Sequence, residues 1–269
     1  MITIELYPKT EVVNELDLKN LSNIDFKKYN QKLVSSIQLT YNFRKKKLGD
    51  LFNIKIKNNK DQRLIINGSN NFFKNLGSNW KSDNLIINGD TGSYLGYKMH
   101  GGRIEVNGSC KNFVGCKMTG GKIIVNKNVG DYVGGADYGE KIGMNGGVIV
   151  VKKNAGNYVG SFMRRGLIVV EGDINKKCAN NLIAGTIISK GNVSDGLGYN
   201  MKRGTIIMCD ESAIPKRKFT NCGEQTIKFL EIFRRYYKED VKIPKSYSKF
   251  IKYVGNIDNN GLGEILYVV

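Results

Sequence analysis

The sequence is poor in the residues that cross-link small folds or carry out catalysis. It has three prolines, one histidine, one tryptophan and five cysteines in 269 residues, and no two cysteines form a Cys-x-x-Cys pair. An odd number of cysteines without such a pair argues against a disulfide framework and against a cysteine-based metal site. One histidine (His100) leaves no Ser-His-Asp or Cys-His set to assemble. We therefore expect a reduced protein with no bound metal and no catalytic residues of its own.

Long apolar runs and targeting signals are missing as well. No stretch approaches the roughly 18 apolar residues that indicate a membrane-spanning helix. The N-terminal "MITIELYPKT" lacks the pattern of a signal peptide. The phosphate-binding pattern Gly-x-x-x-x-Gly-Lys-Ser/Thr is also absent. These absences predict a cytoplasmic protein without membrane contact, and they leave the 32 glycines in need of another explanation.

Acidic residues are few relative to basic ones, and the formal net charge is +18. Such a charge points to an acidic partner such as nucleic acid, anionic lipid or a polyacid. Only nine of the 42 basic residues are arginine, however, and asparagine is abundant. An AT-rich genome produces this Lys/Asn bias at any tolerant surface position. We attribute most of the charge to that bias and regard the arginine positions as more informative.

What the sequence does contain is a regular glycine period. The glycines that close successive units are separated by 19, 26, 19, 19 and 19 residues, at Gly102, Gly121, Gly147, Gly166, Gly185 and Gly204. A fixed period of this length indicates one structural unit stacked on copies of itself. The Leu-x-x-Leu-x-Leu pattern of a leucine-rich repeat is missing, which excludes that architecture.

The units share columns of like residues. Each contains a short alternating strand, such as Ile104/Val106. An aromatic residue follows in four units, at Tyr94, Phe113, Tyr132 and Tyr158, with a glycine two residues later. A methionine closes each unit except one, where Leu182 takes its place. Nineteen residues at about 3.3 Å each give roughly 60 Å of chain, which suits one turn of a parallel β-helix. We therefore predict an all-β protein, a right-handed single-stranded parallel β-helix with 19-residue turns. An asparagine column at Asn88, Asn107 and Asn126 is expected to form a structural hydrogen-bonded ladder.

Three regions follow from the extent of the repeat. Residues 1–62 form a small N-terminal β segment with strand-like runs "MITIELYP", "SSIQLTYNF" and "LFNIKIK". Residues 63–209 form the repeat domain. Residues 210–269 form a C-terminal extension, with a helix expected over 224–239 from its apolar spacing and a final strand "GEILYVV".

The outward side of the repeat strands departs from the expected alternation. Its positions are apolar in six of seven units: Ile86, Glu105, Ile124, Val150, Val169, Ile188 and Ile207. A solvated face would be polar, so this face is expected to be covered. The cover could be a terminal segment of the chain, a partner protein, or both.

Two irregularities in the repeat are candidate functional features. A seven-residue insertion lies near "GADYGEK" at 135–141, and insertions in solenoids often form binding loops. Basic pairs replace the usual Gly-Gly corner in two units, as Arg164-Arg165 and Lys202-Arg203. Two turns of a stack separate these pairs by about 10 Å, so they could form one anion-binding strip; the alternative is a solvated edge.

The ordered motifs resemble a known family. "KLGDLFNI" (47–54), "MNGG" (144–147), "MRRG" (163–166), "LIAGTI" (182–187), "MKRGTI" (201–206) and "VGNIDNNGLGEIL" (254–266) stand in the order found in the β-helical, C-type subunit of formylmethanofuran dehydrogenase and of its relative, the formyltransferase/hydrolase complex. The repeat is also similar to the Gly-x-Gly-x-Gly β-helix at the C-terminal end of glutamate synthase. Lys127 and Lys153 stand where the family pattern has glycine.

This resemblance implies a non-catalytic scaffold subunit of an enzyme complex in one-carbon metabolism. Such a complex moves a formyl group between a tetrahydropterin carrier and a furan-type coenzyme, methanofuran or methylofuran, and hydrolyses it to formate. The implied partners are amidohydrolase-like and formyltransferase-like subunits, which carry the active sites, and we expect no cofactor bound by this chain alone. The family's coenzymes have a glutamate-rich tail, so the resemblance implies cofactor-binding roles for Arg164, Arg165, Lys202 and Arg203.

Three other interpretations stay open. The chain could be the C-type subunit of a formylmethanofuran dehydrogenase proper, which links the coenzyme to CO2. It could be an independent module that binds a polyanion through its basic edge, although we do not expect nucleic acid. It could also be a detached glutamate-synthase-like β-helix, which would have no counterpart for the N-terminal 60 residues.

Overall fold

The computed structural model describes residues 1–24, 26, 30–81, 83–226, 231–232, 235 and 249–269. The strands are β1 (Ile2–Pro8), β2 (Leu16–Asp17), β3 (Gln38–Tyr41), β4 (Arg44–Lys47), β5 (Phe52–Asn58), β6 (Arg63–Ser69), β7 (Phe73–Lys74), β8 (Asn84–Gly89), β9 (Arg103–Val106), β10 (Lys122–Val125), β11 (Asn145–Val151), β12 (Arg165–Val170), β13 (Thr186–Ser189), β14 (Arg203–Met208), β15 (Phe219–Thr226), β16 (Lys249–Gly255) and β17 (Leu262–Val268). Short helices occur at α1 (Gln31–Ser35) and α2 (Leu48–Leu51), with 3-10 turns at Lys19–Asn23, Glu211–Ala213 and Ile257–Asn259.

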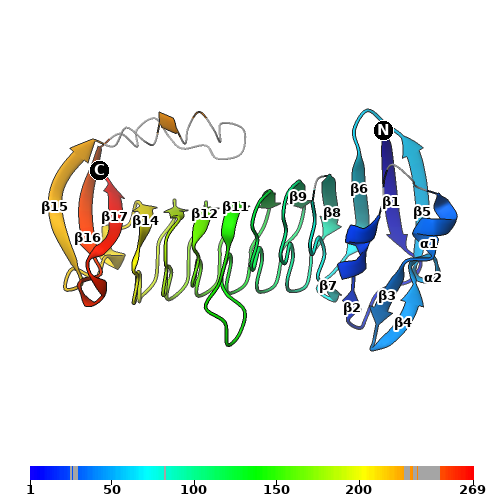
Figure 1. Ribbon diagram of the computed structural model, residues 1–269, viewed down its shortest axis with the longest axis horizontal. Coiled ribbons are helices and arrows are strands. Elements are labelled where there is room, and N and C mark those ends of the chain that lie inside the picture. The colour runs from blue at the N-terminus through cyan, green and yellow to red at the C-terminus, as the bar shows by residue number, and fades with distance from the viewer. Residues whose placement is uncertain (25, 27–29, 82, 227–230, 233–234, 236–248) are drawn as a thin grey trace.

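The described strands form an elongated stack (Figure 1). Thirteen of them make one sheet in the order β15-β16-β17-β14-β13-β12-β11-β10-β9-β8-β6-β1-β5, and the other four make a small sheet in the order β4-β3-β2-β7. The prediction of an all-β protein is confirmed. Strands β1, β3 and β5 occupy the three N-terminal runs expected to be strands, and β17 occupies the predicted final strand.

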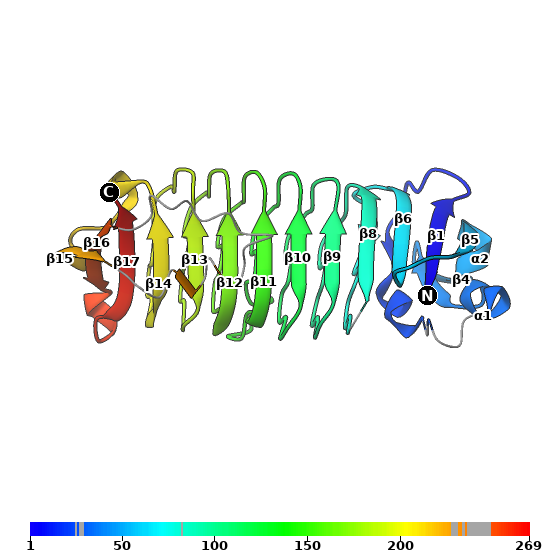
Figure 2. The same ribbon diagram turned by 90° about the horizontal axis from the view of Figure 1, so that it is seen from above.

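A parallel ladder runs along the centre of the large sheet. Strands β6, β8 to β14 and β17 pair in parallel, each with the next in that order, and Figure 2 shows them side by side with the same direction. Side chains 19 residues apart meet on neighbouring coils, as Asn107 and Asn88 do. The interval rises to 26 where Asn154 meets Asn128, because the insertion lies between β10 and β11. A second series of parallel bridges, from Thr91 to Val193, links the coils away from these strands.

The interior of each coil is filled by the predicted columns. Ile104, Ile123 and Ile149 have no exposed surface, and neither do the methionines that close each unit. Leu182 takes the methionine position once and is equally buried. Successive coils therefore place like side chains on like side chains, and the apolar core continues through the whole ladder.

The outward apolar column is largely buried within this single chain. Val150, Val169, Ile188 and Ile207 have no exposed surface, and they form a second hydrophobic cluster with Phe250 and other residues. Ile86 and Glu105, near the N-terminal end, are half-buried. Burial by the chain itself favours the intramolecular cover over a partner protein for the coils from β10 to β14.

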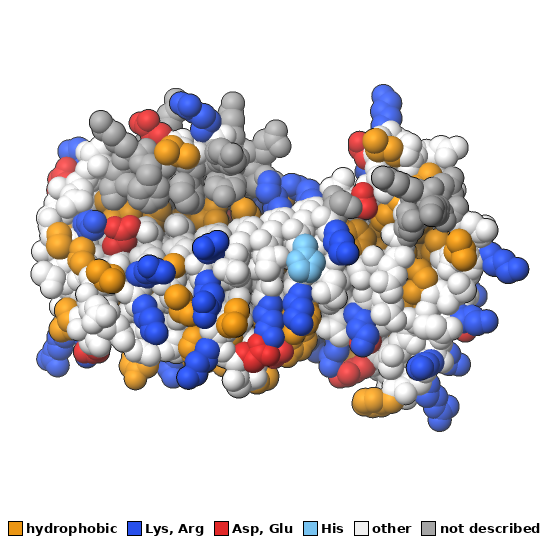
Figure 3. Space-filling model, in the orientation of Figure 1, with side chains coloured by type: hydrophobic (Ala, Val, Ile, Leu, Met, Phe, Trp, Pro, Cys, Tyr) orange, Lys and Arg blue, Asp and Glu red, His pale blue; other side chains and the backbone are white. Residues whose placement is uncertain are grey.

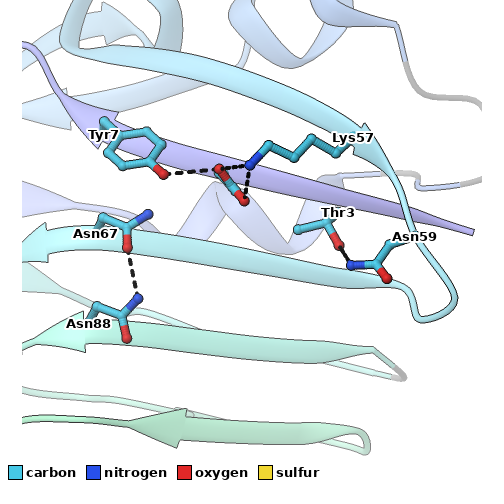
Figure 4. Close-up of polar contacts among 7 residues, drawn as sticks. Thr3, Tyr7, Lys57, Asn59, Asn67 and Asn88 are labelled. Atoms are coloured by element: carbon cyan, nitrogen blue, oxygen red, sulfur yellow. Dashed lines mark hydrogen bonds and ion pairs between the residues drawn. The ribbon is translucent and has the colours of Figure 1, made fainter.

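The asparagine column forms the predicted ladder. Asn88, Asn107 and Asn126 each donate an amide hydrogen bond to the asparagine one coil earlier, with N–O distances of 2.7–2.8 Å, and Asn67 is the first member. Figure 4 shows that first rung, between Asn67 and Asn88. The same column continues as charged residues, where the Glu171 carboxylate accepts hydrogen bonds from Lys152 and Lys190 at 3.1 and 3.0 Å.

Glu171 should make the protein's free energy of unfolding depend on pH in the acidic range. Burial raises its pKa, but the hydrogen bonds from Lys190 and Lys152 outweigh this and hold the pKa below its usual value. A carboxyl with a lowered folded pKa stabilises the protein above its unfolded pKa, and this contribution disappears as pH falls through the folded pKa. We expect Glu171→Gln to lower stability by roughly 0.5–1 kcal/mol at pH 7 and by less at pH 3. Thermal unfolding of both proteins between pH 3 and pH 7 checks this; a difference that does not shrink with falling pH would contradict it.

The N-terminal segment closes one end of the stack. Strand β1 pairs antiparallel with β5 and parallel with β6, and so continues the large sheet. On its surface the Glu5 carboxylate accepts hydrogen bonds from the Tyr7 hydroxyl and from Lys57, while Asn59 donates to the Thr3 hydroxyl (Figure 4). These contacts join β1 to β5 within the end piece, and the pairing of β1 with β6 attaches it to the first coil.

The C-terminal segment closes the other end. Strand β17 pairs in parallel with β14, and β16 and β15 follow in antiparallel pairing. Most of the helix predicted over 224–239 lies outside the described residues. Within that range, 224–226 belong to β15, and 231–232 and 235 are helical.

Candidate functional site

The two basic pairs occupy equivalent positions on coils two turns apart. The backbone N–H groups of Arg164, Ile183 and Lys202 each donate to a carbonyl on the preceding coil at 2.8–2.9 Å. Ile183 therefore lies on the coil between the two pairs. At about 4.8 Å per coil, the pairs are about 10 Å apart, and all four basic side chains are exposed. The structure brings the predicted residues to one edge, as their spacing indicated.

The second basic pair borders a pocket that the sequence did not reveal. Lys202 and Arg203 line a cavity of about 400 Å³ together with Asp258, Asn259 and Asn260 of the C-terminal segment. Arg203 is in register with Leu262 at the start of β17, which explains the proximity. Amide groups beside two cations suit a carboxylate ligand, although Asp258 places one negative charge in the same pocket. Lys218 pairs with Asp258 at 2.5 Å and offsets part of that charge.

The aromatic column forms a continuous stack on a different side of the coils. The rings of Tyr94, Phe113, Tyr132 and Tyr158 lie parallel within 8°, with centroids 4.8–4.9 Å apart. All four residues have φ between 61° and 65°. The stacking distance matches the interval between coils, so the backbone repeat itself sets the ring geometry.

The insertion folds back onto this aromatic stack. Tyr138 contacts the edges of Phe113 and Tyr132, with centroids 4.9 and 5.8 Å away. The Tyr94 hydroxyl donates to Asp137 at 2.9 Å, and Lys117 pairs with Glu140. Burial and the Asp137 hydrogen bond raise the pKa of Tyr94, so its hydroxyl stays a donor at neutral pH. The loop is therefore held in one position while Tyr138 remains 70% exposed.

Three of the five cysteines are buried, and the one histidine is exposed. Burial raises the pKa of the Cys110, Cys116 and Cys178 thiols to about 12, so none is a reactive thiolate at neutral pH. His100 lies on the surface (Figure 3), with Nδ1 2.9 Å from the Thr119 hydroxyl. No His, Cys, Asp or Glu group suited to a metal ion occurs in the part of the chain that the structure covers. Among the same residues, no helix is long and apolar enough to cross a bilayer.

Comparisons with known proteins agree on one family. The GXGXG motif family matches residues 30–260. The C-type subunit of the molybdenum-containing formylmethanofuran dehydrogenase 1 of Methanothermobacter wolfeii is 38% identical over 91 residues, which is 34% of this chain. That match spans 23% of the relative's length.

A solved structure is similar over the whole chain. It is a chain in the crystal structure of the formyltransferase/hydrolase complex from Methylorubrum extorquens in complex with methylofuran. The TM-score is 0.86 and the identity 27%, and the match covers 99% of each chain. The similarity therefore includes both end segments as well as the coils.

Proposed function

We propose that this chain, which belongs to the GXGXG motif family, is the C-type subunit of a formyltransferase/hydrolase complex. In this role it is a non-catalytic scaffold. The observation that carries this proposal is the match over 99% of both chains to a member of such a complex. The two end segments and the insertion distinguish this chain from a bare repeat. In this proposal the active sites belong to the other subunits.

The complex would serve one-carbon metabolism linked to tetrahydromethanopterin. It would transfer a formyl group to or from a furan-type coenzyme and hydrolyse the formyl coenzyme to formate. Its other subunits would be amidohydrolase-like and formyltransferase-like, and the coenzyme would be held by the complex rather than by this chain alone. We place the complex in the cytoplasm, in keeping with five free cysteines.

The finer description of the fold belongs to the same proposal. Parallel coils at 19-residue intervals support a right-handed single-stranded parallel β-helix, because parallel crossovers in one sheet are almost always right-handed. We retain the division into an N-terminal β segment (1–62), a repeat domain (63–209) and a C-terminal extension (210–269).

Within the complex, the basic corner would hold the acidic tail of the coenzyme. This corner consists of Arg164, Arg165, Lys202 and Arg203. Its support is the exposed strip of cations on one edge and the pocket with amide groups beside the second pair. A row of carboxylates on an extended tail could contact cations about 10 Å apart, because about three extended residues cover that distance.

Reversing the charge of this corner should release the coenzyme. In the assembled complex we expect the double variant Arg165→Glu, Arg203→Glu to retain at least tenfold less furan coenzyme, because each charge-assisted contact contributes about 1.5–3 kcal/mol. Coenzyme bound after gel filtration measures the effect. The control is Lys111→Glu, Lys153→Glu, which makes the same charge change at exposed coil positions. Equal retention by the two double variants would exclude the corner as the tail site.

The assembly itself is tested by co-expression. With the amidohydrolase-like and formyltransferase-like chains of the same genome, this chain should co-elute as one complex at 0.5 M salt. The second candidate, a formylmethanofuran dehydrogenase proper, is favoured by the 38% identical segment; it predicts assembly with redox subunits instead. Recovery of this chain alone, bound to nucleic acid that salt removes, would support a polyanion-binding module and contradict both.

A further inference from the structure

The insertion loop, residues 135–142, projects from the wall of coils between β10 and β11 (Figure 1). It presents two apolar side chains to solvent: Tyr138 is 70% exposed and Ile142 is 49% exposed. A single exposed apolar residue is common on protein surfaces and needs no explanation. What distinguishes Tyr138 is that its ring stands on a projecting loop and is nevertheless held in place.

The chain fixes the Tyr138 ring before any partner is present. The ring contacts the edges of Phe113 and Tyr132, at centroid distances of 4.9 and 5.8 Å. The Tyr138 backbone N–H donates to Oδ1 of Asp137 at 2.9 Å, and Glu140 forms an ion pair with a coil lysine. An aromatic side chain that is already ordered loses little conformational entropy on binding, which is why such residues serve as anchors in protein interfaces.

A small cleft lies beside Tyr138, between the loop and the coils that follow it. Its volume is about 170 Å³, and its lining includes Tyr138 and Glu140 on the loop and Tyr158, Phe162 and Asn180 on the coils. Small-ligand sites are larger, at about 300–1,000 Å³, so this cleft suits one inserted side chain rather than a small molecule. A projecting ring beside a cleft of this size is suited to interlock with a protein surface.

The surface around the loop is positively charged. Lys98, Lys141 and Lys177 are exposed, and none of them pairs with a carboxylate in the described part of the chain. The ammonium groups of Lys98 and Lys177 lie over tyrosine rings that border the loop, 5.3 Å from the ring centroids, and keep their charge. The loop's own acidic residues are engaged, Glu140 in its ion pair and Asp137 as acceptor of two hydrogen bonds. A partner face that is complementary to this surface therefore carries carboxylates.

We propose that the insertion loop is the anchor by which this chain binds a partner protein. The Tyr138 ring would enter an apolar pocket of the partner, and carboxylates at the rim of that pocket would meet Lys98, Lys141 and Lys177. One of these carboxylates can accept the hydrogen bond of the Tyr138 hydroxyl, which a buried tyrosine needs. A second copy of this chain does not fit, because a symmetric contact would place the same cations against one another. Since the partner would be another subunit of the complex, this proposal rests on the proposed function.

Hydrogen exchange in the native assembly tests the contact directly. Over the described residues, the backbone N–H groups of Lys141 and Ile142 donate no hydrogen bond, so they should exchange rapidly in the free chain. In the assembly purified from native cells through a tag on this chain, we expect both amides to exchange at least tenfold more slowly. An intact assembly with unprotected amides would overturn the loop as the anchor and leave the proposed function standing. Recovery of a free monomer would contradict both.

Substitutions at Tyr138 test the ring itself. In the assembly formed by co-expression, Tyr138→Ala should raise the concentration at which this chain dissociates at least tenfold, since tyrosines are frequent hot spots of interfaces. Mass photometry of a dilution series measures this concentration. Tyr138→Phe keeps the ring and should change it less than threefold. Tyr199→Ala, at a tyrosine that is 65% exposed on another coil, should leave it unchanged. Equal dissociation of the Tyr138→Ala and Tyr199→Ala assemblies, or of the Tyr138→Ala and Tyr138→Phe assemblies, would overturn the proposal.

Reversing the charge beside the loop tests the chemistry of the partner without altering the ring. We expect Lys141→Glu, Lys177→Glu to weaken the assembly at least tenfold. The control is Lys111→Glu, Lys153→Glu, the same charge change at exposed coil positions, which should not weaken it. Both charge variants should melt within about 4 °C of the unaltered free chain, because the lysines lie on the surface. An assembly that tolerates both variants equally would contradict a partner face rich in carboxylates and overturn the proposal.

Discussion

Replacing Gly121 by alanine is expected to destabilise the coil stack by about 3 kcal/mol. Gly121 has φ of 86°, a region that side chains other than glycine enter at a cost. A Cβ atom there would also lie 2.8 and 2.9 Å from the backbone C and O of Gly101 on the preceding coil. The backbone of a stacked coil cannot move without disrupting the parallel ladder. The energetic costs of the positive φ angle and of the close contact with Gly101 therefore add.

A matched glycine separates these two effects. Gly139, in the insertion loop, has φ of 74°, and no atom lies within 4 Å of the position that a Cβ would take there. We expect Gly139→Ala to cost only about 1 kcal/mol, and Gly121→Ala to lower the melting temperature by about 6–12 °C. Equal losses for the two variants would mean that backbone strain alone, without close contact between coils, requires glycine at the corners.

Removing the Phe113 ring is expected to have the other large effect. Its side chain is 3% exposed and contacts the rings of Tyr94, Tyr132 and Tyr138. Phe113→Ala leaves the strain of the positive φ angle unchanged, since both residues have a Cβ, but it leaves a gap in the stack of rings. The expected loss is about 3–5 kcal/mol. Phe113→Tyr is the control, because tyrosine already occupies the same position on neighbouring coils, and it should cost less than about 1 kcal/mol.

The Phe113 variant should also loosen the insertion loop. Tyr138 rests on two rings and would lose the nearer one. Amide hydrogen exchange of residues 136–140 should therefore become faster in Phe113→Ala and stay slow in Phe113→Tyr. A loop that exchanges at the same rate in both variants would show that Asp137 and Glu140 hold it without the aromatic contact.

Much of the coil stack could be predicted because each unit repeats the same local pattern. Ile104 and Ile123 alternate with outward residues, and Asn88 and Asn107 recur at the interval that stacks them. Such regularities depend only on the spacing of residues along the chain. The basic corner could be predicted for the same reason, since Arg164 and Lys202 lie a whole number of coils apart.

Contacts between segments of different kinds could not be predicted in this way. The Tyr94–Asp137 hydrogen bond joins a coil to the insertion, and no periodicity relates the two. Asn260 lies in the pocket beside Arg203 because the strand that follows it, β17, pairs with β14. In the sequence, β15 and β16 come between these two strands. The pocket lined by Asp17 and Asp137 could not be predicted either, because these residues come from segments that only the folded chain brings together.

We infer that this chain is a structural subunit of a formyltransferase/hydrolase complex. The most direct test is purification of the tagged chain from its native cells at 0.5 M salt, followed by native mass spectrometry. We expect one assembly that contains this chain, an amidohydrolase-like subunit, a formyltransferase-like subunit and a furan coenzyme. Recovery of the chain as a free monomer, or with partners unrelated to formyl transfer, would contradict it.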